Sequence, residues 1–176
     1  MMSKNINNIF IIGPLGAGKS SIGRAVAKKS RKTFMDSDHE LQRRTGVPLA
    51  WIIESETIEG FRKREMAIID ELTQMNNVVL STGGGCIETP ENRTFLSERG
   101  IVVYLQISLQ EQLIRTQRKE TRPLLDVDEP KKKLIELNER RVTFYEEIAD
   151  ITVNTDTSIP PILAKLILKQ IKQKLK

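Results

Sequence analysis

The sequence contains little of what stabilises small secreted domains or builds metal centres. Cys86 is the only cysteine and His39 the only histidine among 176 residues. One cysteine excludes an intramolecular disulfide, and this pair cannot supply the three or four nitrogen and sulfur ligands of a zinc site. We therefore expect a protein of the reducing cytoplasm, with His39 on a helix surface and Cys86 as a small packing residue.

Long apolar runs and aromatic side chains are also scarce. No apolar run approaches the ~20 residues of a membrane-spanning helix, and the start of the chain lacks the pattern of a secretory signal peptide. We therefore expect no membrane association. Aromatic residues make up 5% of the chain, which leaves few rings on which nucleic-acid bases could stack.

The charge balance is basic. Lysine and arginine outnumber aspartate and glutamate by 28 to 23, and the resulting net charge of +5 suits anionic ligands without naming one. The lysines gather at residues 131–133 and along residues 165–176, where we interpret them as solvated faces of helices. A nucleic-acid surface is the alternative, but we expect small-molecule partners, no nucleic acid and a monomeric chain.

The most specific motif is a phosphate-binding loop near the start of the chain. Residues 13–20 read GPLGAGKS and fill every position of the pattern G-x-x-x-x-G-K-[ST]. Glycines let successive backbone N–H groups point at phosphate oxygens, and the helix that follows adds its positive N-terminal end. Lys19 is then expected to reach the β- and γ-phosphates, and the Ser20 hydroxyl to bind the accompanying Mg²⁺. The alternative is a glycine-rich turn with a chance lysine.

Short apolar runs alternate with helical patterns along the whole chain. Five runs predict strands, at residues 9–12, 33–35, 78–81, 101–105 and 151–153. Helices are predicted at residues 20–32, 38–45, 48–53, 59–75, 90–99 and 131–149 and from about 158 onward, with a turn at 54–58. A further helix follows Ser108, with Leu113 and Ile114 on its apolar side. This alternation predicts an α/β fold in a single domain, residues 1–176, with a five-stranded parallel sheet and helices on both faces.

Residues 118–130 lose the helical periodicity and are rich in charged side chains. A polar stretch between two helices predicts a mobile lid over a site. A plain surface loop is the alternative.

Two strand ends carry unusual residues, and in an open parallel sheet ligands bind at the carboxyl ends of the strands. Asp36 and Asp38 follow the second strand, and two residues on an extended backbone face the same side. One would serve a metal and the other a substrate hydroxyl, unless they cap a helix. The third strand ends in Gly83, Gly84 and Gly85. Each glycine loses much backbone entropy on folding, so three in a row indicate a place where a ligand approaches the backbone closely; a tight turn is the alternative.

Arginines supply the remaining charges. Arg62 begins a helix and can clamp a carboxylate through two parallel hydrogen bonds. Arg122 lies in the predicted lid, from which it can reach the transferring phosphate as an arginine finger. Arg115 can stack on an adenine ring, and Arg140 and Arg141 end a charged helical run. Each of them, taken singly, also fits a solvated surface residue.

These motifs together resemble the shikimate kinase family, in the nucleoside monophosphate kinase-like group of P-loop proteins. The resemblance rests on GPLGAGKSS at 13–21, FMDSD at 34–38, EGFRKRE at 59–65, LSTGGG at 80–85, RTQRKETRPLL at 115–125 and YEEIAD at 145–150. It covers essentially the whole chain. The phosphate-binding loop alone is shared by many activities, whereas the ordered set is specific.

The resemblance implies a P-loop kinase fold and ATP-dependent phosphorylation of the 3-hydroxyl of shikimate, on the route to chorismate and the aromatic amino acids. It implies Mg²⁺ as cofactor, bound at Ser20 with Asp36 nearby. The residues implied to bind ATP are Gly16, Ala17, Gly18, Lys19, Ser20, Ser21, Arg115 and Arg122. Those implied to bind shikimate are Asp38, Arg62, Gly83, Gly84, Gly85 and Arg141. Lys19, Asp38 and Arg122 would be catalytic: the two cations neutralise the phosphates, and the carboxylate orients the attacking hydroxyl and accepts its proton. The loop at 154–157 would border the adenine.

One departure concerns the arginine that meets the substrate carboxylate. The family commonly reads Arg-x-Pro-Leu-Tyr, whereas this chain reads RVTFY at 141–145 with Arg140 alongside. The distance to Tyr145 favours Arg141 over Arg140. Two other functions stay open at this point: a kinase for another small hydroxylated acceptor, and a nucleotide-dependent ATPase that binds nucleic acid.

Overall fold

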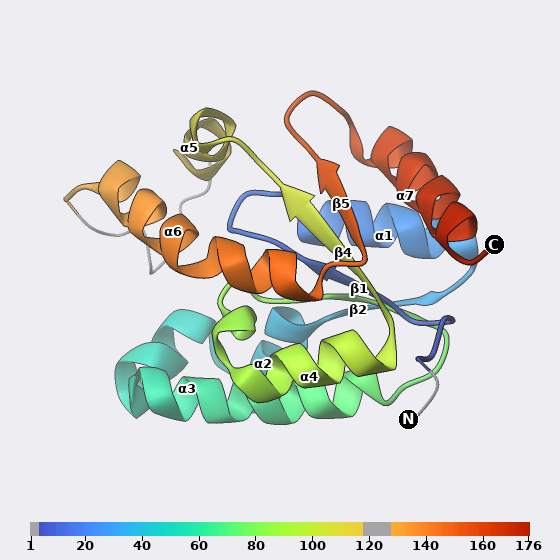
Figure 1. Cartoon of the computed structure of the whole chain (residues 1–176). Helices are drawn as coiled ribbons and strands as arrows, with labels where there is room; N and C mark the ends of the chain where they lie inside the picture. The colour runs from blue at the N-terminus through green and yellow to red at the C-terminus, as the bar shows by residue number, and fades with distance from the viewer. Residues whose placement is uncertain (1–3, 118–127) are drawn as a thin grey trace.

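The computed structural model of the protein describes residues 4–117 and 128–176. Its centre is a five-stranded, all-parallel sheet in the order β2-β3-β1-β4-β5 (Figure 1). The strands are β1 Ile9–Ile12, β2 Thr33–Asp36, β3 Val78–Ser81, β4 Ile101–Gln106 and β5 Ile151–Asn154. The predicted strands and their parallel arrangement are confirmed.

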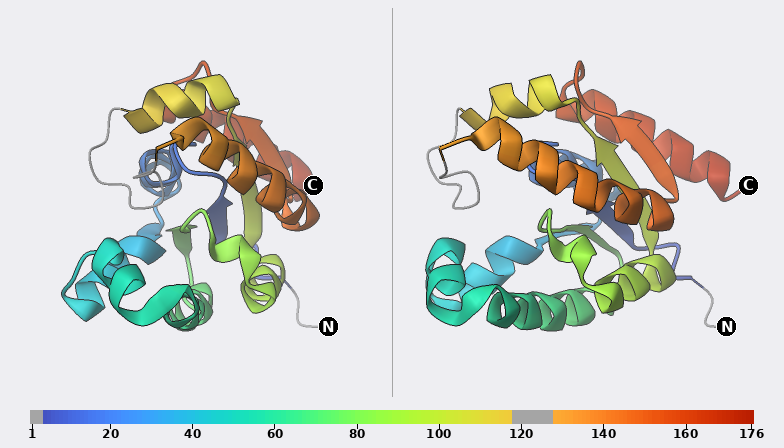
Figure 2. Two further views of the ribbon diagram at one scale, coloured as in Figure 1. Left: turned by 90° about the vertical axis from the view of Figure 1, so that its left-hand side faces the viewer. Right: turned by 60° about the vertical axis from the view of Figure 1, so that its left-hand side comes forward.

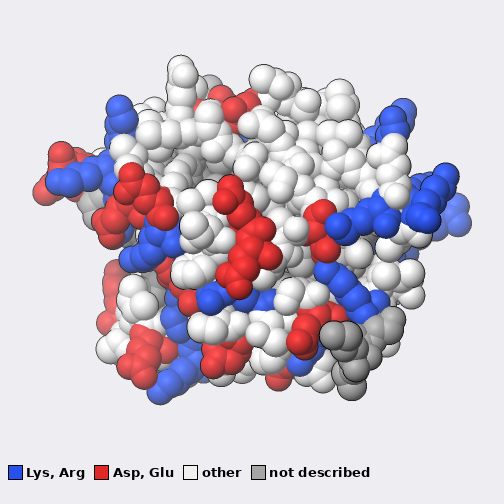
Figure 3. All heavy atoms as spheres, viewed as in Figure 1, with Lys and Arg blue, Asp and Glu red and all other residues white. Residues whose placement is uncertain are grey.

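Helices alternate with the strands along the chain. They are α1 Lys19–Ser30, α2 Ser37–Thr45, α3 Leu49–Thr73, the 3-10 helix η1 Cys86–Glu88, α4 Pro90–Arg99, α5 Leu109–Gln117, α6 Pro130–Ile148 and α7 Pro160–Lys174. The sheet lies between the pair α1 and α7 and the group α3, α4 and α6 (Figure 2). Within the described ranges, no helix is both long and apolar enough to cross a bilayer. Acidic and basic side chains are interspersed on the face shown in Figure 3.

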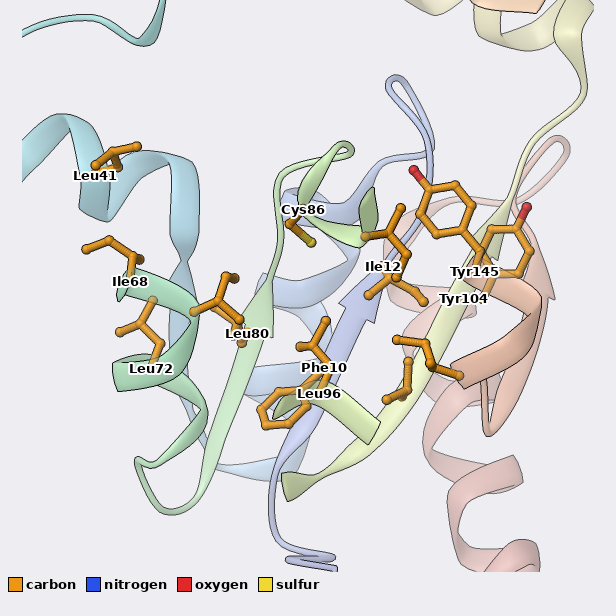
Figure 4. Close-up of a cluster of buried hydrophobic side chains, with 14 of the residues drawn as sticks. Phe10, Ile12, Leu41, Ile68, Leu72, Leu80, Cys86, Leu96, Tyr104 and Tyr145 are labelled. Atoms are coloured by element: carbon orange, nitrogen blue, oxygen red, sulfur yellow. The ribbon is translucent and has the colours of Figure 1, made fainter. Parts of the chain in front are cut away.

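The alternation of side chains along β1 builds the two cores. Ile9 and Ile11 pack with α1 and α7 on one face, whereas Phe10 and Ile12 pack with α3, α4 and α6 on the other. All four side chains are buried, because β1 has a strand on each side and helices on both faces. Figure 4 shows the second of these cores. Cys86 packs there as expected, and His39 is exposed on α2.

Two helical segments differ from the prediction. The expected turn at 54–58 is a kink inside α3, where Thr57 alone leaves the helical conformation with φ 68° and ψ 162°. In α5 the buried side chains are Gln112 and Thr116, whereas Ile114 is 40% exposed. The Gln112 amide donates to the carbonyl of Leu15 at 2.8 Å, so a hydrogen bond rather than an apolar face attaches α5 to the phosphate-binding loop.

Candidate active site

A cavity of about 550 Å³ lies at the carboxyl ends of β1, β2 and β3. Its walls come from segments that are distant in the sequence. They include Leu15, Gly16, Gly18, Lys19, Ser20, Ser21, Ile22, Asp36, Asp38, Thr82, Gly84, Arg115, Thr155, Ser158, Ile159, Pro160 and Leu163. The phosphate-binding loop and residues of both unusual strand ends therefore meet in one place, as the strand-end rule predicts.

The phosphate-binding loop turns sharply out of β1 and into α1. Gly16 and Gly18 have φ of 84° and 87°, a left-handed conformation that favours glycine. The first turn of α1 begins at Lys19 on the cavity wall, so the positive end of the helix faces the cavity. The Lys19 ammonium donates to the carbonyl of Pro14 at 2.9 Å, which keeps its side chain over the loop.

Asp36 connects β2 to the loop and to α2. Its Oδ2 accepts a hydrogen bond from the Ser20 hydroxyl at 2.6 Å, and its Oδ1 accepts from the backbone N–H groups of Asp38 and His39. Asp36 is thus the N-cap of α2, and Asp38 lies in the first turn of that helix. The expectation that both lie on extended backbone was wrong, because α2 begins at Ser37; both nevertheless line the cavity.

Two carboxyl groups meet at Gly83. A Cβ on Gly83 would lie 2.7 Å from Asp38 Oδ1 and 3.0 Å from Glu65 Oε1. Burial, aided by the negative charge of Asp36, raises the pKa of Asp38 from 3.8 to about 6, against the opposing charges of Lys19 and Arg62. Burial likewise raises the pKa of Glu65 to about 7, although the Arg62 charge and hydrogen bond oppose it.

Glu65 is a site residue that the sequence reasoning missed. Its side chain is 3% exposed, and it accepts from Arg62 Nη1 at 2.7 Å. A sequence signal existed, because Glu65 stands four residues after Phe61 and four before Ile69, on the apolar side of the helix. A charged residue on a buried helix face needs a partner, and here the partner is an arginine of the site.

The three glycines after β3 leave space mainly for protein side chains. The space beside Gly83 holds Asp38 and Glu65, and a Cβ on Gly85 would collide with Arg62 and lie 2.9 Å from Arg141 Nη2. Gly84 differs: it lines the cavity, its Cβ would make only ordinary contacts, and its carbonyl accepts from the Tyr145 hydroxyl at 2.5 Å. The glycines therefore bring two carboxyl groups and two guanidinium groups up to one backbone segment.

The two arginines of α6 differ in burial. The Arg141 side chain is 5% exposed and adjoins Gly84 and Gly85, whereas Arg140 is 51% exposed. This burial supports the choice of Arg141 over Arg140 for the substrate carboxylate. Both donate through Nε to Glu88 Oε1, at 3.1 Å from Arg141 and 2.6 Å from Arg140.

Arg115 joins two walls of the cavity. It donates to the Thr155 carbonyl at 2.6 Å and to the Gly16 carbonyl at 3.4 Å, and it pairs with Glu111 at 2.8 Å. This guanidinium ties the end of β5 to the phosphate-binding loop, a contact that the adenine-stacking prediction did not include. Arg122 and most of the predicted lid, residues 118–127, lie outside the described residues.

The comparisons with known proteins agree over most of the chain. The family model described as shikimate kinase matches residues 15–175. The shikimate kinase of Psychromonas ingrahamii is 50% identical over 161 residues, covering 92% of this chain and 94% of the relative. That of Vibrio parahaemolyticus is 47% identical over 167 residues, covering 95% and 97%.

Solved structures give the same result. The shikimate kinase from Acinetobacter baumannii, in complex with shikimate, matches with a TM-score of 0.94 and 45% identity over 98% of this chain and 97% of that one. The enzyme from Aquifex aeolicus matches with a TM-score of 0.80 and 31% identity, over 96% and 98%. A gluconokinase from Sinorhizobium meliloti shares the fold at 18% identity and a TM-score of 0.63. On the family model, the relatives and these structures together, the chain belongs to the shikimate kinase family.

Proposed function

We propose that the cavity described above is where this shikimate kinase transfers the γ-phosphoryl group of ATP to the 3-hydroxyl group of shikimate. One observation carries the assignment: Leu15, Gly16, Gly18, Lys19 and Ser20 of the phosphate-binding loop line the same cavity as Asp38. A kinase needs the phosphoryl donor and a group that orients the attacking hydroxyl within reach of each other. The cavity supplies both.

The nucleotide side of the cavity is assigned to the loop and its neighbours. The residues that would bind ATP are Gly16, Ala17, Gly18, Lys19, Ser20, Ser21, Arg115 and Arg122. Lys19 would bind the β- and γ-phosphates, since phosphoryl transfer through a loose transition state depends on positioning and charge neutralisation. The role of Arg122 as the arginine finger stays a prediction from the sequence.

Ser20 and Asp36 fit the Mg²⁺ ion that accompanies ATP in kinases. Their oxygens lie 2.6 Å apart on the cavity wall, and Mg²⁺ prefers hard oxygen ligands. Mg²⁺ bound with a nucleotide takes one or two protein ligands and completes its shell with waters and phosphates, so a two-residue set suffices. When bound, the ion would neutralise charge on the phosphate oxygens.

The acceptor side is assigned to Asp38, Arg62, Arg141 and the glycine segment 83–85. With a pKa of about 6, Asp38 is mostly ionised at neutral pH, yet close enough to neutrality to accept a proton from the attacking hydroxyl. Arg62 and Arg141 would bind the carboxylate of shikimate, because guanidinium groups match carboxylate geometry. Together these contacts would hold the 3-hydroxyl toward the phosphate-binding loop.

ADP formation tests this assignment directly. The purified protein is incubated with ATP and Mg²⁺ and, separately, with shikimate, with gluconate, or with DNA or RNA. We expect ADP formation only with shikimate, and a phosphate monoester at the 3-hydroxyl by ³¹P NMR. Turnover with gluconate instead would change the acceptor, and stimulation by nucleic acid alone would favour the ATPase alternative.

A further inference from the structure

We propose that Glu88 is a positioning residue of the acceptor site, which aligns Arg62 and Arg141 so that they can bind the carboxylate of the substrate. The inference rests on the proposed function, because it concerns the acceptor side of the same cavity. Glu88 ends the 3-10 helix η1, directly after the glycine segment 83–85. Nothing in its sequence context marked it as a site residue.

Glu88 is the carboxylate at which three arginines meet. Its Oε2 accepts from Arg62 Nη2 at 2.8 Å, and its Oε1 accepts from Arg140 Nε at 2.6 Å and from Arg141 Nε at 3.1 Å. The Glu88 side chain is 20% exposed, so these bonds are partly shielded from water. Arg62 belongs to α3 and the other two to α6, so one side chain ties two helices to the glycine segment.

The need for such a residue follows from charge. Arg62 and Arg141 both approach Gly85, and two guanidinium groups side by side repel each other unless an anion lies between them. Burial by itself would raise the pKa of Glu88, but the Arg141 hydrogen bond and the charges of Arg141, Arg62 and Arg140 outweigh it and hold the pKa below its usual range. Glu88 is therefore ionised at neutral pH.

The direction of the hydrogen bonds indicates that Glu88 aligns the arginines and does not block them. Glu88 bonds Arg141 at Nε, on the side of the guanidinium, while Nη1 and Nη2 lie toward Gly84 and Gly85. Arg62 gives one N–H of Nη1 to Glu65 and one of Nη2 to Glu88, and each of these nitrogens carries a second N–H. Donors on both arginines thus stay available for a substrate carboxylate.

This arrangement also gives Arg140 a role. The Arg140 side chain is half-exposed and donates to the same Glu88 oxygen as Arg141, so it fixes the carboxylate from the solvent side. Three guanidinium groups share the carboxyl groups of Glu65 and Glu88, so the arginines of this cluster outnumber the acidic side chains that hydrogen-bond to them, which suits an anionic acceptor. Arg140 would act through Glu88 and not on the substrate.

The test variant is Glu88→Gln, which keeps the size of the side chain and removes its charge. We expect KM and Kd for shikimate to rise about tenfold, the scale of one charge-assisted hydrogen bond, with KM for ATP within about twofold of wild type. Glu91→Gln is the matched control, since Glu91 is an exposed residue of the next helix and should change neither constant. Arg140→Gln should raise KM for shikimate about two- to threefold, and it keeps the proposal testable if Glu88→Gln does not fold.

A neutral acceptor separates positioning from a merely structural role. In the analogue with a primary alcohol in place of the carboxylate, the arginine pair has no charge to bind, so its Kd by calorimetry should be the same for wild type and Glu88→Gln. Equal weakening of both ligands, an equal rise in KM for ATP, or unchanged or tighter shikimate binding would each overturn the proposal. If the wild-type protein forms no ADP in response to shikimate, the proposed function itself is refuted.

Discussion

Replacing Asp38 by asparagine tests two properties of this carboxyl group separately: its contribution to kcat and its effect on the free energy of unfolding. If Asp38 orients or deprotonates the attacking hydroxyl, kcat in Asp38→Asn should fall by about 10²- to 10⁴-fold, the usual contribution of general acid–base catalysis. Nucleotide affinity should hardly change. If Asp38 served only as a polar residue in the first turn of α2, asparagine would be an adequate substitute and kcat would stay near the wild-type value.

The same substitution should stabilise the protein, and the sign follows from the pKa of Asp38. The pKa rises from 3.8 to about 6 on folding, so the folded state holds its proton more tightly than the unfolded state. The free energy of unfolding therefore falls as pH rises from about 4 to about 6, and it stays lowered above that. A shift of about two pKa units, at 1.36 kcal/mol per unit, lowers the free energy of unfolding by at most ~3 kcal/mol at neutral pH. Asparagine carries no charge at this position, so Asp38→Asn should regain up to that amount.

The assay combines shikimate-dependent ADP formation with denaturant unfolding between pH 3 and pH 8. The stability difference between Asp38→Asn and wild type should be near zero at the acid end and reach its plateau above about pH 6. The wild-type kcat/KM should fall below about pH 6 as Asp38 is protonated. Glu98→Gln, at an exposed glutamate of α4 outside the site, controls for loss of charge alone. Retained kcat refutes the catalytic assignment, and a pH-independent stability difference refutes the buried-charge argument.

Three further substitutions test other parts of the site. Lys19→Met should abolish phosphoryl transfer with a native melting profile, because it removes a phosphate contact and no core packing; near-normal turnover would exclude Lys19 from the mechanism. Arg122→Ala should lower kcat by more than ~10³-fold with little change in shikimate affinity, and an effect confined to KM for ATP would make it a ground-state binding residue. Gly85→Ala should raise KM for shikimate by up to ~10²-fold, because its methyl group displaces Arg62 and Arg141; an unchanged KM would contradict their role.

The parts of the molecule that depend on local pattern were predictable. The four apolar residues of β1 indicated a central strand, and the loop motif after it located the nucleotide side of the cavity. The strand-end rule then brought Asp36, Asp38 and Gly84 to the same cavity. These predictions succeeded because each rests on residues adjacent in sequence or on the general geometry of parallel sheets.

The contacts between distant helices were not predictable in the same way. Glu88 acquires its meaning only when α3 and α6 pack beside the glycine segment 83–85 and bring arginines to it. The glycines were predicted to admit a ligand, but at Gly83 and Gly85 they admit the side chains of other elements. No periodicity or spacing contains that information, because it depends on which helix faces which loop.

The buried amide of Gln112 links three segments through hydrogen bonds. It donates to Leu15 in the phosphate-binding loop at 2.8 Å and accepts from Asn138 of α6 at 2.8 Å, and its side chain is 1% exposed. Sliding the loop, α5 or α6 past the others would leave a buried donor or acceptor unpaired, at a cost of about 1–3 kcal/mol. The two hydrogen bonds therefore favour one spacing between the loop proposed to bind ATP and the helix that carries Arg141, and this spacing is present before either substrate binds.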